Sequence, residues 1–322
     1  MTISVAIATY NRAPMVREAV LEALAQSRAP HEIVVSDDAS TDGTISALES
    51  LGDARIKLIR QIRNSGGVGN WNTAIDATCG ALIAWCSDDD RFLPGHLESS
   101  AAYLEAHPEI GLVHSGFVDS IETENDEQQQ PRRLRSSSIL ARSGLIPYLI
   151  RYYDWPFHPS TIVMRREVWE RVGPFNAAYQ FADTEWFLRV VENFPVASLA
   201  RHGVLNRRHA GNWSNRLGSA HLQREVFEMV EGAIARNFTY LRRTLWRTVW
   251  RANARARLAL TLRARLQSGH GEAACAAWHG LLQDTGLPTP EWIERAGAAA
   301  ISAMCAGRDP QFRDQHQSVS PL

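Results

Sequence analysis

The first hundred residues alternate short apolar runs with segments of helical periodicity, and this alternation is the feature that most constrains the fold. The apolar runs lie at 3–8, 32–35, 56–60 and 81–85, and helical segments separate them. Runs that are apolar at nearly every position are typical of strands buried on both faces. Strands that alternate with helices form mostly parallel sheets with helices on both faces. We therefore expect an α/β fold with a mixed, mostly parallel sheet.

Two acidic clusters follow strands of this pattern. Asp37-Asp38 ends the second strand, and Asp88-Asp89-Asp90 ends the fourth. Ligands of such sheets bind outside the carboxyl ends of the strands, so we expect both clusters at one edge. The triplet can hold a hard divalent cation through carboxylate oxygens, and the cation can neutralise a leaving diphosphate. The simpler alternative is a solvated acidic turn, or aspartates that cap the helix before Leu97.

Asp37-Asp38 and the segment 64–70 each allow a functional and a plain structural interpretation. One of the two aspartates can accept a hydrogen bond from a base N–H, or the pair can belong to a turn and an N-cap. The Gly-rich segment fails as a dinucleotide loop, because Asn72 stands where the third glycine belongs. It can instead open a helix whose free N–H groups face an anion, with Asn64 and Gly67 at the site, or it can be a flexible turn.

The remaining segments predict a second half and a helical extension. The expected elements are a strand at 110–118, a long polar loop at 122–138, helices at 167–172 and 183–192, and helical structure from about 217 onward. We expect one domain over 1–215, divided at about residue 120, and a helical C-terminal region at 216–322.

Composition excludes several classes of protein. The chain of 322 residues is 45% hydrophobic and 21% charged, with a formal net charge of −1, so no excess charge directs it to nucleic acid. Its four cysteines form no CxxC pair, which argues against structural zinc and suits a reduced, cytoplasmic setting. We see no signal peptide, and no apolar run approaches the roughly 18 residues of a membrane span.

Six short motifs occur in the order typical of family 2 glycosyltransferases. They are Ser4–Arg12, Glu32–Asp42, Asn64–Asn72, Asp88–Leu97, Arg165–Phe175 and Asp183–Arg189. The chain thus resembles inverting enzymes of the GT-A fold that build bacterial surface polysaccharides, over roughly residues 3–215. The resemblance implies a nucleotide-sugar half at 1–120 and an acceptor half at 121–215. The implied reaction moves a sugar from a nucleotide-diphosphate donor onto an acceptor hydroxyl.

The resemblance also assigns residues of the donor site. The expected donor is a UDP- or dTDP-sugar, and the expected nucleotide-sugar-binding residues are Thr9, Tyr10, Asn11, Asp37, Asp38, Asn64, Gly67, Asn72, Asp88 and Asp90. Asp38 would contact the base. Asp89 would be the main ligand of Mn2+ or Mg2+, with Asp90 and His209 as further ligands. Many members carry an aspartate where this chain has Ser87, which leaves the roles within the triplet open.

In the acceptor half, the resemblance implies that Asp183 is the catalytic base. An inverting transfer needs one carboxylate to take the proton of the attacking hydroxyl. The family usually has a Glu-Asp pair here, whereas this chain has Ala182 before Asp183, and Glu185 is the second choice. Both acids can instead be first-turn residues favoured by the helix dipole. Trp155 and His158 are expected near the acceptor, although core packing is the simpler interpretation.

An arginine-rich stretch at 236–266 contains no acidic residue. Arg243, Arg247, Arg251 and Arg255 recur every four residues, so they share one helical face. Such a helix can lie on an anionic membrane, which suits a lipid-linked acceptor and a peripheral position at the inner face of the membrane. Alternatively, the arginines pair with acids elsewhere or contact another protomer.

Two other functions remain open. A sugar-nucleotidyltransferase shares an α/β nucleotide fold and metal-binding aspartates, but it usually has a glycine-rich loop where this chain has Thr9–Arg12. A non-catalytic sugar-nucleotide-binding partner protein would explain Ser87 and Ala182, the two departures from the family pattern.

Overall fold

The computed structural model describes residues 1–122, 127–131, 138–141, 158–209, 212, 220–239, 243–244 and 247–251. The chain divides into two compact units, Met1–Asn215 and Arg216–Leu322, which we describe separately.

The first half of unit 1 follows the predicted alternation. Its elements are β1 (Ile3–Thr9), α1 (Ala13–Leu24), β2 (Glu32–Asp37), α2 (Thr44–Glu49), β3 (Ile56–Arg60), α3 (Gly67–Asp76) and β4 (Leu82–Ser87). The four strands lie in the order β3-β2-β1-β4, and all of their pairings are parallel. Every residue of β1 and β2 is buried, as the apolar runs predict. The carboxyl ends of these strands therefore meet at one edge of the sheet.

The second half of unit 1 extends the same sheet with mixed pairing. Its elements are β5 (Arg91–Phe92), α4 (His96–Ala106), β6 (Leu112–Glu122), the 3-10 turn η1 (Pro159–Thr161), β9 (Ile162–Arg165), α6 (Arg166–Val172), α7 (Ala182–Asn193) and β10 (Val196–Arg208). The order continues as β4-β9-β6-β10-β5. β9 runs antiparallel to both neighbours, whereas β10 is parallel to β6. The predicted helices at 167–172 and 183–192 are confirmed within one residue at each end.

The long loop predicted at 122–138 is wrong where the structure describes it. β7 (Glu127–Pro131) pairs antiparallel with β6, and β8 (Ser138–Leu140) pairs antiparallel with the start of β10. The side chains of Gln128, Gln129 and Gln130 are exposed. A polar edge strand of this kind is held by backbone pairing to β6 and carries no apolar pattern by which to predict it.

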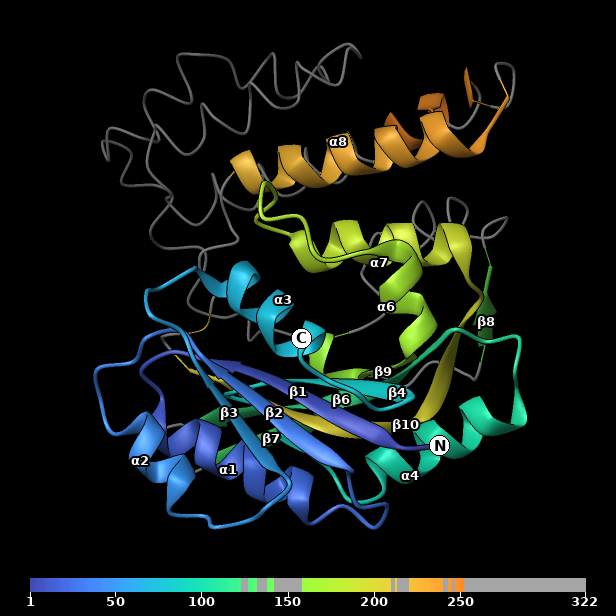
Figure 1. Cartoon of the computed structure of the whole chain (residues 1–322). Coiled ribbons are helices and arrows are strands. Elements are labelled where there is room, and N and C mark those ends of the chain that lie inside the picture. Colours follow the sequence, from blue (N-terminus) through green and yellow to red (C-terminus); the bar gives the residue numbers. More distant parts are fainter. Residues whose placement is uncertain are drawn as a thin grey trace, which may run out of the picture. The chain divides into compact units, whose positions relative to one another are not determined.

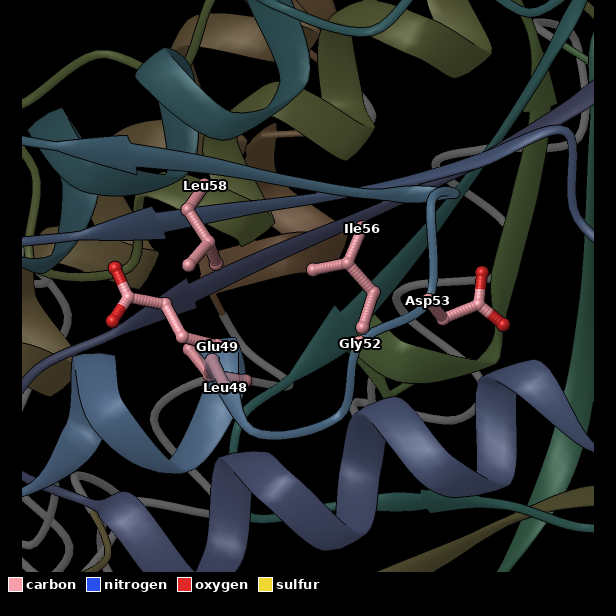
Figure 2. Close-up of a pocket in the computed structure, with 6 residues that line it drawn as sticks. All are labelled: Leu48, Glu49, Gly52, Asp53, Ile56 and Leu58. Atoms are coloured by element: carbon pink, nitrogen blue, oxygen red, sulfur yellow. The ribbon is translucent and has the colours of Figure 1, made fainter.

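Helices cover both faces of the sheet, with α1, α2 and α4 on one face and α3, α6 and α7 on the other (Figure 1). α1 buries Val16, Ala19, Val20 and Ala23, which recur at helical spacing. A shallow hollow lies beside the edge strand β3 (Figure 2), lined by Leu48, Glu49, Gly52, Asp53, Ile56 and Leu58. None of these lining residues is a predicted site residue.

The described part of unit 2 is helical. It contains α8 (Ala220–Asn237), whose Glu231 forms ion pairs with Arg247 at 3.2 Å and with Arg251 at 3.0 Å. Trp250 is buried and stacks on Phe227. Two arginines of the predicted basic face are thus paired with an acid, while Arg255 lies outside the described residues. Within the described part of the chain, no helix has the length and apolar character needed to span a membrane.

Candidate active site

The ends of β1 and β4 bring a hydroxyl and two carboxylates together. Thr9 is the last residue of β1, and its Oγ1 donates a hydrogen bond of 2.8 Å to Asp88 Oδ2. Arg12 follows β1, and its Nη1 donates to Asp88 Oδ1 and to Asp89 Oδ2, each at 2.8 Å. Burial raises the pKa of Asp88 to about 6, against the opposing effect of Arg12.

The end of β10 approaches the same cluster. His209 Nε2 lies 3.2 Å from Asp89 Oδ2, and Asn212 Nδ2 donates to that oxygen at 3.3 Å. Asn212 also accepts a hydrogen bond of 2.5 Å from the His209 backbone N–H and donates to the Arg207 carbonyl at 3.0 Å. Asn212 therefore holds the turn that brings His209 to Asp89.

Asp90 differs from its two neighbours because it points into the protein. It is buried. Its Oδ2 accepts a hydrogen bond of 2.5 Å from Ser160 Oγ, and its Oδ1 accepts one of 3.3 Å from the Arg207 N–H. His158 Nδ1 lies 3.4 Å from the same Oδ2. Burial, followed by the charge of Asp89, raises the pKa of Asp90 to about 8. Both oxygens of Asp90 therefore contact groups inside the protein.

Asp37 and Asp38 lie at the end of β2 and use their oxygens differently. Both oxygens of Asp38 accept from the loop before α3: the Ser65 N–H at 2.7 Å, the Ser65 hydroxyl at 2.9 Å and the Gly66 N–H at 3.0 Å. Asp37 Oδ2 accepts a hydrogen bond of 3.0 Å from the Ser40 N–H. Asp37 Oδ1 is buried, and no described residue donates to it. In this structure Asp38 fixes the Gly-rich loop, and Asp37 keeps an unused acceptor.

The polar residues around these aspartates order the loops of the nucleotide half. Asn11 has a positive φ of 51°, and its Oδ1 accepts 2.8 Å from the Thr41 N–H. Tyr10 beside it is 46% exposed, which leaves a ring face open at the strand ends. Asn64 donates to the Asp38 carbonyl at 3.3 Å, and Gly67 is the first residue of α3.

Asn72 contacts the acceptor half. Its Oδ1 accepts from the Phe175 N–H at 2.9 Å, and its Nδ2 donates to the Phe175 carbonyl at 3.0 Å. These two bonds join the side-chain amide to the backbone of Phe175 and fix the segment that precedes α7. The structure therefore brings Asn72 to the acceptor half and not to the Asp88-Asp89 cluster.

The two acids of α7 lie in different surroundings. Asp183 is in the first turn and partly buried. Its Oδ1 accepts a hydrogen bond of 2.8 Å from the Thr184 N–H, and burial raises the pKa of the Asp183 carboxyl. Both oxygens of Glu185 are engaged by Arg189, at 2.9 and 3.0 Å from its Nε. Asp183 is thus the acid with the perturbed pKa, whereas Glu185 is half of an i,i+4 ion pair.

His158 connects the acid of α7 with the aspartate cluster. Burial lowers its pKa to about 4, while Asp89 and Asp183 act in the opposite direction. Its ring lies 5.3 Å from that of Phe117. The neutral imidazole therefore stands within electrostatic range of both acids. Trp155, the other residue expected near the acceptor, lies outside the described residues.

The donor set at the strand ends fits a hard divalent cation that is shared with phosphate. Mg2+ and Mn2+ are usually held by one or two carboxylates together with substrate phosphates. Asp89 supplies a carboxylate that is 12% exposed, and His209 supplies an adjacent ring nitrogen. No group of three or more His, Cys, Asp or Glu residues is arranged to hold a metal within the described ranges. A cation here would share its coordination with phosphate or water oxygens.

Four residues of the site received no role from the sequence. Arg12, Asn70, Ser160 and Asn212 are each defined by partners far away in the chain. Asn70, for example, donates to the carbonyls of Thr9 and Ser36, both at 3.0 Å. Arg12 and Asn70 lie within motifs typical of the family, which is the signal that could have singled them out.

A parallel half-sheet with acidic clusters at its strand ends, extended by a mixed half that bears a second acid, defines a GT-A transferase fold. S. aureus TarS, solved in complex with UDP-GlcNAc, shares it with a TM-score of 0.67 and 16% identity, over 95% of this chain and 88% of that one. Residues 4–188, more than half of the chain, match the sequence model described as Glycosyl transferase family 2. The protein therefore belongs to glycosyltransferase family 2.

Relatives in sequence agree with this assignment. The chain is 29% identical to the uncharacterized glycosyltransferase YwdF of Bacillus subtilis over 202 residues, which are 61% of this chain and 70% of YwdF. It is 38% identical to the succinoglycan biosynthesis protein ExoO of Rhizobium meliloti over 91 residues, 28% of this chain and 26% of ExoO. The predicted family and GT-A fold are thus confirmed.

Proposed function

We propose that the protein is an inverting glycosyltransferase that transfers a sugar from a UDP- or dTDP-sugar to an acceptor hydroxyl, with Asp183 as the base. The observation that carries the proposal is the contrast within α7. Asp183 is partly buried with a raised pKa, and Glu185 is neutralised by Arg189. A carboxylate with a raised pKa is a better proton acceptor than an ordinary surface acid.

Asp183 would take the proton of the acceptor hydroxyl as that oxygen attacks the anomeric carbon from the face opposite the leaving group. The charges of Asp89 and Asp183 both act on the pKa of the neutral His158 ring. Because this ring is neutral, it would shape the acceptor side of the site without adding a positive charge beside Asp183. Asn72 would act through Phe175, by fixing the segment that leads into α7.

The nucleotide half would hold the donor. Tyr10 is exposed and would face the base, with Asp37 and Asp38 beside it. Asp38, Asn64 and Gly67 would order the loop around the nucleotide. Asp89 and His209 would hold Mn2+ or Mg2+ together with the diphosphate. Such a cation, when bound, stabilises the negative charge of the leaving diphosphate.

The biological setting that we propose is the assembly of a bacterial polysaccharide, with a sugar, free or lipid-linked, as acceptor. The likeness to ExoO supports this setting. The pairing of Arg247 and Arg251 with Glu231 favours the ion-pair interpretation of the basic stretch over the membrane interpretation. A flotation assay with anionic vesicles distinguishes them, and we expect the protein to stay unbound.

Donor turnover is the experiment that tests the function. The release of nucleoside diphosphate from UDP-, dTDP- and GDP-sugars is measured with and without Mn2+, in the presence of simple sugar acceptors. Asp183→Asn should bind the nucleotide as the wild type does and lose about 10²–10⁴-fold in turnover, the usual contribution of a general base. Glu185→Gln is the matched control and should lose far less.

The same data address the alternative functions. Nucleotide binding without turnover in the wild type would favour a non-catalytic sugar-nucleotide-binding partner protein. Formation of a nucleotide sugar from a nucleoside triphosphate and a sugar phosphate would favour a sugar-nucleotidyltransferase. Equal turnover by the wild type and Asp183→Asn would refute the assignment of the base.

A further inference from the structure

Arg12 stands in the turn between β1 and α1, and one of its nitrogens is shared by two carboxylates. Nη1 lies 2.8 Å from Asp88 Oδ1 and 2.8 Å from Asp89 Oδ2. The Arg12 side chain is 28% exposed, whereas those of Asp88 and Asp89 are 8% and 12% exposed. Two adjacent carboxylates that are mostly removed from water need a cation beside them, and Arg12 supplies that charge.

Asp89 Oδ2 is the oxygen on which the donors of the site converge. Arg12 Nη1, His209 Nε2 and Asn212 Nδ2 lie 2.8, 3.2 and 3.3 Å from it. Asp89 and His209 are the residues that would hold a divalent cation under the proposed function. The guanidinium therefore lies on the oxygen that a cation held by Asp89 and His209 would use, and two like charges cannot share one oxygen at little cost.

We propose that Arg12 competes with the divalent cation for Asp89, and that nucleotide diphosphate relieves the competition by giving Arg12 a new anionic partner. The inference rests on the proposed function. Arg12 is part-exposed on a long, flexible stem at the strand ends, so its head can turn from the carboxylates toward a phosphate. A guanidinium binds phosphate oxygens through two parallel N–H donors, and its charge is permanent.

This arrangement couples the two ligands of the site. Without nucleotide, the Arg12 guanidinium pairs with the carboxylates, and Mn2+ binds weakly. With nucleotide, Arg12 pairs with the diphosphate and leaves Asp89 to the metal. By linkage, the metal strengthens nucleotide binding by the same factor. Arg12 is thus a positioning residue for the transfer, distinct from the groups that would contact the metal.

Binding of Mn2+ alone tests the inference without using activity. Free Mn2+ is measured by electron paramagnetic resonance while Mn2+ is titrated into the wild type and into Arg12→Gln, with a thermal melt to show that each is folded. We expect Arg12→Gln to bind Mn2+ at least about tenfold more tightly than the wild type without nucleotide, because it removes the competing charge. Arg12→Met repeats the measurement if the glutamine variant does not fold.

Two further variants separate charge competition from a general effect. Arg12→Lys keeps a positive charge at the same place and should keep weak Mn2+ binding. Arg28→Gln breaks an ion pair with Glu105 at the opposite end of β1 and should match the wild type. UDP should strengthen Mn2+ binding in the wild type and do so much less in Arg12→Gln.

The outcomes also separate this inference from the proposed function. Equal or weaker Mn2+ binding by folded Arg12→Gln overturns the competition, even if the wild type turns over its donor with Mn2+. Equally tight binding by Arg12→Lys and Arg12→Gln overturns it as well. If the wild type turns over no donor in any condition and Arg12→Gln still binds Mn2+ more tightly, the proposed transferase function is refuted and the competition is supported.

Discussion

Replacing Asn70 with alanine should loosen the ends of three strands at once. Asn70 is 2% exposed, and its Nδ2 donates to the carbonyls of Thr9 at the end of β1 and Ser36 in β2, each at 3.0 Å. Its Oδ1 accepts 2.7 Å from Gln61, which follows β3. One side chain thereby links the strand ends on which the nucleotide half of the site is built.

The structure gives the size of the expected effect. Each of the three hydrogen bonds contributes about 1 kcal/mol net, so Asn70→Ala should lower the free energy of unfolding by about 3 kcal/mol. In a domain of this size, that corresponds to a fall of roughly 10 °C in melting temperature. The affinity for nucleotide should fall too, because Thr9 and Asp37 lose the anchor that fixes their backbone.

The assay is thermal and urea unfolding followed by circular dichroism, with nucleotide affinity measured at a temperature where both proteins are folded. Asn193→Ala is the matched control, since Asn193 is exposed and makes a single bond of 2.8 Å to the Arg189 carbonyl. The control should change the free energy of unfolding by less than about 0.5 kcal/mol. A loss below about 1 kcal/mol in Asn70→Ala would show that the strand ends are held by other contacts.

Three further perturbations have expected outcomes. Burial opposes ionisation of Glu32, but hydrogen bonds from Lys57, Ser4 and Cys79 hold its pKa at about 2, so its stabilising effect is present above about pH 4.5 and lost as the pH falls toward 2. Glu32→Gln should cost about 2 kcal/mol at pH 7, less than the full shift because Lys57 is half-exposed, and the difference from wild type in urea unfolding should vanish in acid. Asp183 must be deprotonated to act as base, so kcat/KM should fall as the pH drops through a pKa above that of an ordinary aspartate, and an acid limb at or below the ordinary value would contradict this. A Cβ at Gly203 would collide with the buried His96 ring and Ser115 Oγ, so Gly203→Ala should lower the melting temperature by several degrees, corresponding to about 1–3 kcal/mol, whereas an unchanged value would show that the ring can move aside.

The strands of the first half were predictable because their signal is local. β1 and β2 are buried along their whole length, and such a strand must be apolar whatever its neighbours are. β7 has no such requirement, because it pairs its backbone with β6 while the side chains at 128–131 are exposed. Its sequence, Glu-Gln-Gln-Gln-Pro, is compatible with a loop, and only the distant partner makes it a strand.

The site shows the same division between local and distant causes. The position of Asp37 and Asp88 at strand ends follows from the alternation of strands and helices. The partners of Asp38 and Asn72 do not, because they depend on how the loop before α3 and the segment at Phe175 return to the sheet. Whether a carboxylate is free to meet a ligand is therefore a property of the tertiary structure.

The three consecutive aspartates differ in the tertiary contacts that they make. Asp88 turns toward Thr9, Asp89 toward His209 and Asp90 toward Ser160, so identical side chains face three different elements. Ser87 contacts the same Ser160 hydroxyl at 3.2 Å. An aspartate in its place, as in many members of the family, would put a second acid beside the buried Asp90, where like charges are costly. With serine there, the additional acid is Asp88 on the opposite side of the strand end, where Arg12 can neutralise it.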